Sequence, residues 1–198
     1  MDSDFMYPAI PPCQLEADEP IIDSNGNQIA TLTDYWKWAH SDLLGNTERG
    51  ILAEYIVRLA LEIKDDRLSW NKYDLLYNKN IRIEVKSSAY IQTWGQKTLS
   101  KISFSISPSY GWDYENNTYE NVKKRQSDIY IFCLLNCKNQ ELIQPTDLSQ
   151  WRFFVISTKE LDKYSPKAKS ISLSALRNLP IVECDFSDLK NVVDNIEI

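Results

Sequence analysis

The run YDLLYNKNIRIEVKSS, residues 73–88, constrains the fold of this chain more than any other segment. Two short strand patterns flank the turn-forming residues 78–80, Asn-Lys-Asn, so the run predicts a β-hairpin. We expect a three-residue loop in which Asn80 takes a positive φ angle. Continuing the ladder away from that loop places Asp74 opposite Glu84.

The second strand of this hairpin carries charges on one face only. Glu84 and Lys86 alternate with apolar neighbours, so they share the polar face, and Asp74 joins them across the ladder. The apolar face is formed by Ile81, Ile83 and Val85. Two facing carboxylates repel each other unless a cation sits between them.

This arrangement predicts a site for a hard divalent cation, with magnesium the first choice and manganese the alternative. Asp74 and Glu84 would be ligands, and the main-chain carbonyl of Val85, between the two charged side chains, would be another. Lys86 would contact a scissile phosphate or orient the attacking water. The bland alternative is a surface hairpin whose cross-strand ion pair contributes no more than about 1 kcal/mol.

The segments around the hairpin supply the rest of a core. Residues 47–64 repeat apolar side chains at helical spacing and predict an amphipathic helix. Further strands are predicted at 101–107, 128–135 and 151–157, of which 128–135 is continuously apolar.

The chain divides into three parts by composition. Residues 1–45 are expected to form an extended acidic arm with a short aromatic helix, TDYWKWA, capped by Thr33. Residues 46–182 are expected to form the core domain, and residues 183–198 an acidic C-terminal tail.

Charge is distributed unevenly along a chain whose net charge is -6. The N-terminal part is strongly acidic, whereas residues 79–125 carry eight bases against four acids. A locally basic surface is therefore expected within an acidic protein, with aromatic residues interleaved. Such a surface suits phosphates and stacked bases. The residues favoured for nucleic-acid contact are Lys97, Lys101 and Lys124.

The remaining composition excludes several kinds of site. No segment is long and apolar enough to span a membrane, and the acidic start is unlike a secretion signal, so a cytoplasmic location is expected. The single histidine, His40, is expected to be structural and argues against histidine-rich zinc sites. The four scattered cysteines are expected to be buried thiols.

The order of helix, strand with Asp74, and strand with Glu84-Val85-Lys86 resembles the core of the PD-(D/E)XK, or restriction-endonuclease-like, nucleases. The resemblance covers roughly residues 46–157, with Tyr73 where the family motif has proline. It implies an α/β fold with a mixed central sheet of four to five strands flanked by helices in αβββαβ order.

The resemblance also implies two auxiliary residues. The first helix of such nucleases often lends another acid, and Glu54 stands at the corresponding place in RGILAEYIV. The alternative is that Glu54 belongs to a solvated stripe with Arg58 and Glu62, each four residues from the next. Gln92 is an auxiliary polar candidate because a glutamine often follows the lysine in the family.

The function these features favour is metal-dependent hydrolysis of DNA, as an endonuclease of a restriction or defence type, with repair or recombination left open. A homodimer is expected because cutting both strands of a duplex needs two sites. The alternative is a catalytically silent nuclease fold that binds or assembles with a protein or nucleic-acid partner.

Overall fold

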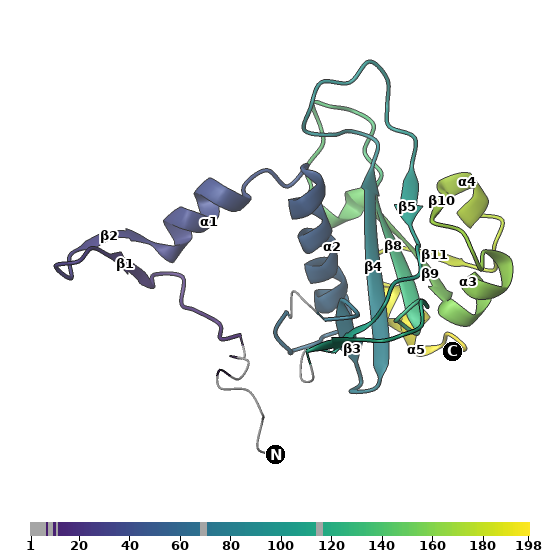
Figure 1. Cartoon of the computed structure of the whole chain (residues 1–198). Helices are drawn as coiled ribbons and strands as arrows, with labels where there is room; N and C mark the ends of the chain where they lie inside the picture. The colour runs from purple at the N-terminus through teal and green to yellow at the C-terminus, as the bar shows by residue number, and fades with distance from the viewer. Residues whose placement is uncertain (1–6, 8–9, 11, 68–70, 114–116) are drawn as a thin grey trace.

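A five-stranded mixed sheet forms the centre of the computed structural model, which describes residues 7, 10, 12–67, 71–113 and 117–198 (Figure 1). Its strand order is β11-β9-β8-β4-β3. β4 and β8 run parallel, and the other neighbouring pairs are antiparallel. The strands are β3 (Leu75–Tyr77), β4 (Ile81–Ala89), β8 (Ile129–Leu135), β9 (Trp151–Ser157) and β11 (Val182–Cys184). The expected α/β class and mixed sheet are confirmed.

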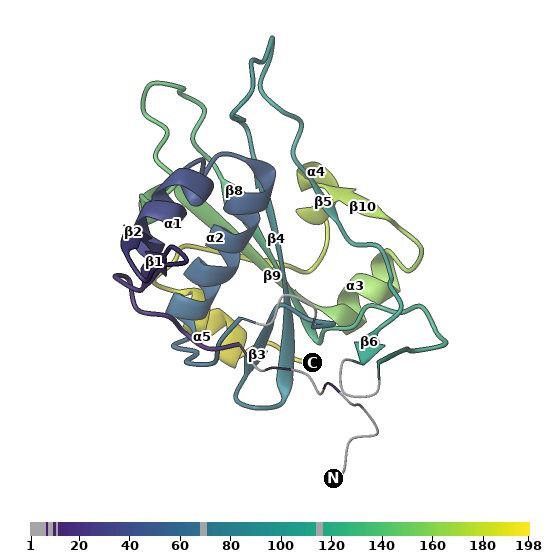
Figure 2. The same cartoon turned by 60° about the vertical axis from the view of Figure 1, so that its left-hand side comes forward.

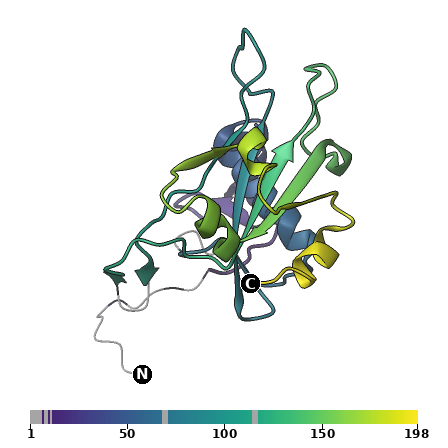
Figure 3. The same ribbon diagram turned by 90° about the vertical axis from the view of Figure 1, so that its right-hand side faces the viewer.

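Strand β8 is buried along its whole length because both faces of the sheet are covered. One face packs against helices α2 (Asn46–Ala60) and α5 (Leu189–Asp194). The other face, seen in Figure 3, is covered by smaller elements. These are the two-stranded sheet of β5 (Ser103–Ser105) and β10 (Ser170–Ser172), with helices α3 (Thr158–Tyr164) and α4 (Leu173–Leu176). Burial on both faces explains the continuous apolar run of β8.

Helix α2 ends earlier than its apolar periodicity predicts. Ala53, Ile56 and Val57 pack against the sheet, which confirms the buried face. The helix stops at Ala60 because Glu62 has a φ of 57°, in the left-handed region that ends helices. Ile63, inside the expected helix, still reaches the core from the following turn.

The connection from β4 to β8 differs from the expected αβββαβ order. Strand β5 pairs with β10 outside the central sheet, so it is not the third strand of that sheet. The described part of this connection contains no crossover helix; it carries the short strands β6 (Trp112–Asp113) and β7 (Thr118–Tyr119) instead. Parallel pairing requires a connection long enough to bring the chain back to the end of the sheet where the first strand began. The described part of this connection does so without a helix.

The N-terminal arm lies on the side of α2 away from the sheet (Figure 1) and comes in front of α2 in the turned view (Figure 2). It contains β1 (Pro20–Ile22), β2 (Gln28–Thr31) and helix α1 (Leu32–His40). The expected cap at Thr33 is wrong: Thr31 caps the helix through a capping box with Asp34, which satisfies two otherwise unpaired backbone donors. No side chain of α1 is buried.

The C-terminal segment contributes to the core as well as to the surface. Within residues 183–198, expected as an acidic tail, Leu189 and Val193 of α5 are buried beside α2. A short 3-10 helix, Leu148–Gln150, precedes β9.

Of the four cysteines, which were expected to be buried, only Cys133 is fully buried, and Cys13 is exposed. Among the described residues, none of the helices has the length and apolar character needed to cross a membrane.

Candidate active site

The β3–β4 hairpin brings Asp74 and Glu84 together as its sequence predicts. Tyr77 pairs with Ile81 and Leu75 pairs with Ile83, so the next positions along the ladder are Asp74 and Glu84. The predicted register is confirmed. The turn differs in one respect: the positive φ angles occur at Asn78 and Lys79, not at Asn80.

Asp74 is fixed against the backbone of the neighbouring strand. Its carboxylate accepts a hydrogen bond of 2.7 Å from the backbone N–H of Val85, and its own N–H donates to the carbonyl of Ile83. The side chain therefore lies beside the Glu84-Val85-Lys86 tripeptide. This contact uses one carboxylate oxygen and leaves the other available to a ligand.

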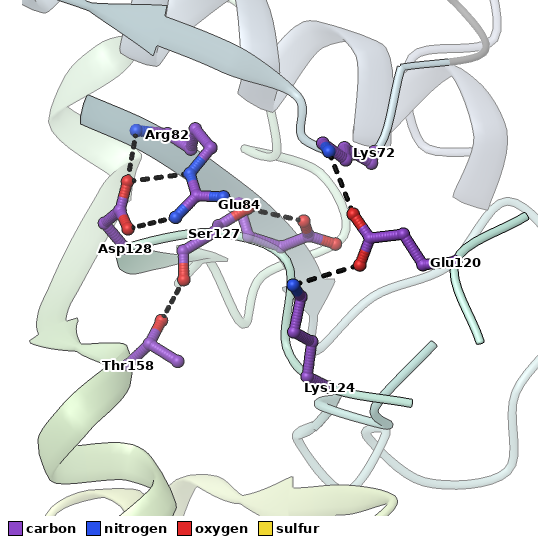
Figure 4. A network of polar contacts seen from close by, with 8 residues as sticks. All are labelled: Lys72, Arg82, Glu84, Glu120, Lys124, Ser127, Asp128 and Thr158. Atoms are coloured by element: carbon purple, nitrogen blue, oxygen red, sulfur yellow. Dashed lines mark hydrogen bonds and ion pairs between the residues drawn. The ribbon is translucent and has the colours of Figure 1, made fainter. Parts of the chain in front are cut away.

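Each carboxylate oxygen of Glu84 has a partner: an ammonium group for one and a hydroxyl group for the other. Lys86 Nζ lies 2.5 Å from Oε1, as expected for residues that share a strand face. The Ser127 hydroxyl donates to Oε2 over 3.1 Å (Figure 4). Ser127 is buried at the start of β8 and its carbonyl accepts from Thr158, so the hydroxyl is held in place.

The charges of this cluster are incompletely balanced. Burial, followed by the negative charge of Glu84, raises the pKa of Asp74 to about 7. Burial by itself lowers the pKa of Lys86, but the charges of Glu84 and Asp74 outweigh burial and the net direction is upward. One ammonium thus faces two carboxyl groups, and a divalent cation would restore the balance.

The oxygen donors of the cluster fit a hard cation. The backbone groups of Ile83 and Val85 both point to the β3 side, since Ile83 accepts from Asp74 N–H and Val85 donates to its carboxylate. Strand β3 begins only at Leu75, so it does not cover the carbonyl of Val85. Within the described ranges, His, Cys, Asp and Glu side chains form no group of three or more arranged for a metal. The oxygens that could hold a cation here are the two carboxylates and the carbonyl of Val85.

Glu54 approaches the same site from α2. Its charge contributes to the raised pKa of Asp74, and its carboxylate is 2.6 Å from Nε of Arg67. The solvated stripe is not observed: Arg58 donates to the carbonyls of residues 64 and 65, and Glu62 pairs with Lys190. Glu54 is only 14% exposed, consistent with a side chain that faces the site.

Gln92 lies apart from the cluster. It follows the end of β4, six residues beyond Lys86, which along an extended strand is roughly 20 Å. Its amide accepts from the buried Arg49 of α2 and donates to the carbonyl of Ala89. These contacts tie α2 to the end of β4 and indicate a structural part for this glutamine.

The three expected nucleic-acid lysines are not close together. Lys97 and Lys101 are exposed on the loop between β4 and β5. Lys124 pairs with Glu120 at 3.0 Å, and Glu120 in turn pairs with Lys72, two residues before Asp74 (Figure 4). Lys72 and Ser127 are not among the predicted site residues, but tertiary contacts join Lys72 to Glu120 and Ser127 to Glu84. The one sequence signal for Lys72 was its position, two residues before Asp74.

Comparison with known proteins identifies a nuclease family. No curated protein matches the chain. The family model described as bacteriophage T4 endonuclease IV matches residues 21–175. The match includes the β3–β4 hairpin, α2 and most of the segment around Lys124. The chain therefore belongs to the bacteriophage T4 endonuclease IV family.

Proposed function

We propose that the chain is a metal-dependent endodeoxyribonuclease whose catalytic residues are Asp74, Glu84 and Lys86. The observation that carries this proposal is the meeting of two carboxylates and one ammonium on the β3–β4 hairpin of a chain in an endonuclease family. The raised pKa of Asp74 supports it, since perturbed carboxyl groups cluster at functional sites.

The residues divide the work by their chemistry. Asp74, Glu84 and the Val85 carbonyl would hold magnesium, with manganese as an alternative, and Glu54, paired with Arg67, would be an auxiliary catalytic residue that adds negative charge beside them from α2. When bound, such a cation activates water and stabilises charge on phosphate oxygens. Lys86 contributes a positive charge beside Glu84, where it neutralises a nonbridging phosphate oxygen or orients the attacking water. Ser127 keeps Glu84 in the rotamer that faces Asp74.

DNA is the proposed substrate, and a PD-(D/E)XK type of catalysis is the proposed chemistry. Restriction or defence is the proposed biological setting. A homodimer stays a prediction that follows from duplex cutting and not from a feature of the described residues.

A catalytically silent binding module is the second candidate, and the arm favours it. Helix α1 buries no side chain, and Trp38 is 85% exposed. A hollow of about 820 Å³ lies between the arm and α2, lined in part by Leu15, Trp36 and Tyr55. Exposed aromatic side chains beside a hollow are typical of a surface that binds another macromolecule.

Incubation of supercoiled and linear DNA with Mg²⁺ or Mn²⁺ tests the enzyme proposal. We expect the parent protein to nick or linearise DNA and Lys86→Ala to be inactive. Lys79→Ala is the matched control, because Lys79 is an exposed lysine in the turn of the same hairpin and should retain activity. Equal activity of the two variants would contradict the catalytic assignment. Calorimetric titration of Glu84→Ala with Mn²⁺ is the complementary test, and binding equal to that of the parent would favour the silent module.

A further inference from the structure

Glu120 is held between two lysines next to the candidate active site. Its Oε1 is 3.0 Å from Lys72 Nζ and its Oε2 is 3.0 Å from Lys124 Nζ (Figure 4). Lys72 lies two residues before Asp74. The pKa of Arg82, which shares a strand face with Glu84, is raised mainly by its hydrogen bond to Asp128, and the charge of Glu120 adds to this. The Glu120 carboxylate thus lies between two positive charges at the edge of the site.

The space for this carboxylate depends on Gly111. A Cβ atom at residue 111 would lie 2.8 Å from Cδ of Glu120 and 2.9 Å from Oε1 of Gln126. Gly111 also accepts the backbone hydrogen bond of Glu120 over 2.8 Å. The Oε1 atom of Gln126 is buried and has no hydrogen-bond partner among the described residues. The absence of a side chain at Gly111 therefore allows the Glu120 carboxylate to lie where it meets the two lysines.

We propose that Lys72 and Lys124 form a binding site for a backbone phosphate of the nucleic acid, and that Glu120 fills this site until nucleic acid replaces it. The inference rests on the proposed function for its substrate class. A carboxylate and a phosphodiester each present two oxygens that share one negative charge, so two ammonium groups that clamp the first can clamp the second. Glu120 thus binds the two lysines in the place that the substrate phosphate would take.

The exposure of the three side chains supports exchange. Side chains of Lys72 and Glu120 are 31% and 28% exposed, and that of Lys124 is 53% exposed. The two lysines hold the pKa of Glu120 below its ordinary value, so the carboxylate is charged at neutral pH. Ion pairs this open to water are weak, and release of Glu120 requires only rotation of its side chain. The phosphodiester gains the same two cations and releases counterions.

Binding of a short fluorescein-labelled oligodeoxynucleotide, measured by anisotropy in EDTA, tests the proposal without cleavage. We expect Glu120→Gln to bind about 3- to 10-fold more tightly than the parent, with a dependence on salt that is steeper by about one ion per freed contact. Glu141→Gln is the matched control. It makes the same change in net charge at an exposed glutamate that joins no ion pair among the described residues.

Two further variants separate displacement from net charge. Gly111→Ala keeps the charge of Glu120 but pushes the carboxylate from its place, so it should tighten binding in the same direction. Lys72→Ala or Lys124→Ala in the Glu120→Gln background should remove the gain. Melting curves check that each variant is folded.

Several results would overturn the proposal. These are equal affinity of Glu120→Gln and Glu141→Gln, persistence of the gain after loss of either lysine, or absence of oligonucleotide binding by the folded parent. Failure of the proposed catalysis is a separate result, because it is scored by Mg²⁺-dependent cutting and the Lys86→Ala comparison. A chain that cuts DNA but shows no Glu120 effect would retain its function and lose this site.

Discussion

Two aspartates that flank the same strand have opposite environments. Asp128 accepts from the backbone N–H of Arg82 at 2.9 Å and from its guanidinium at 2.6 and 3.0 Å. The hydrogen bonds from Arg82 lower the pKa of Asp128. Among the described residues, the Asp74 carboxylate receives one hydrogen bond, from the N–H of Val85. Burial and the charge of Glu84 raise its pKa to about 7.

The difference separates a structural pair from a site. The charge of Asp128 is neutralised by its own dedicated arginine, so nothing further is needed there. Asp74 shares one lysine with Glu84, so positive charge is short there, and on the proposed function a bound cation would compensate the shortage. Removing charge should therefore damage function at Asp74 and stability at Asp128.

The largest expected effect is the loss of cleavage in Asp74→Asn. The amide is a poor ligand for a hard cation, so we expect cleavage of DNA to fall by about 10³-fold or more. Initial rates with supercoiled DNA and Mg²⁺ measure the effect. Asp128→Asn, the matched substitution, should stay within about tenfold of the parent. Equal losses in the two variants would erase the distinction between the two aspartates.

The next effect is a dependence of stability on pH that belongs to Asp74. Its pKa is raised from 3.8 in the reference state to about 7 in the folded protein, so the folded state binds protons more strongly than the unfolded state. The free energy of unfolding should fall as pH rises from about 4 to about 7 and then level, by more than about 1 kcal/mol. Denaturant titrations over this range measure it.

Metal binding should reverse this trend. Mg²⁺ needs the deprotonated carboxylate, so the rise in melting temperature caused by Mg²⁺ should be larger at about pH 8 than at about pH 6. Asp74→Asn should show neither the decline of stability through neutrality nor the effect of Mg²⁺. Persistence of both in this variant would show that another group is responsible.

A smaller effect is expected for the stability of Asp128→Asn. Arg82 and Asp128 are 36% and 21% exposed, so water screens part of their interaction. We expect the variant to lose about 1 kcal/mol of stability, including the hydrogen bonds to Arg82. Urea unfolding measures this loss, and Asp162→Asn, which loses the partner of the buried Arg125, gives a second structural pair for comparison. If Asp128→Asn were as stable as the parent but impaired in cleavage, Asp128 would have to be assigned to the active site.

The smallest effect is expected for Ser127→Ala. Glu84 keeps Lys86 but loses the hydroxyl that fixes its second oxygen, so cleavage should fall by about 3- to 10-fold. Ser127→Thr should recover part of the activity because it keeps a hydroxyl. An unchanged rate for Ser127→Ala would show that Lys86 and Asp74 alone position Glu84.

Local features of the fold could be predicted from the sequence with good detail. The hairpin register depends on a loop of three residues and on alternation along one strand, both of which are written within sixteen consecutive positions. The strands predicted at 128–135 and 151–157 from their apolar runs, which are also local patterns, are observed at Ile129–Leu135 and Trp151–Ser157. The end of α2, the cap at Thr31 and the lack of a helix in the described part of the β4–β8 connection could not be predicted, because contacts and backbone angles that periodicity does not show decided each of them.

The sequence by itself determined which groups could form the cluster: Asp74, Glu84 and Lys86 are neighbours through a short hairpin, where few backbone conformations join the strands. Only the tertiary structure decided which residues surround them. Ser127 reaches Glu84 through the parallel pairing of β4 with β8, Glu120 and Lys124 meet Lys72 beside Asp74, and the C-terminal helix enters the core from the far end of the chain. Contacts between distant segments depend on how whole faces pack, and that cannot be read from a local pattern.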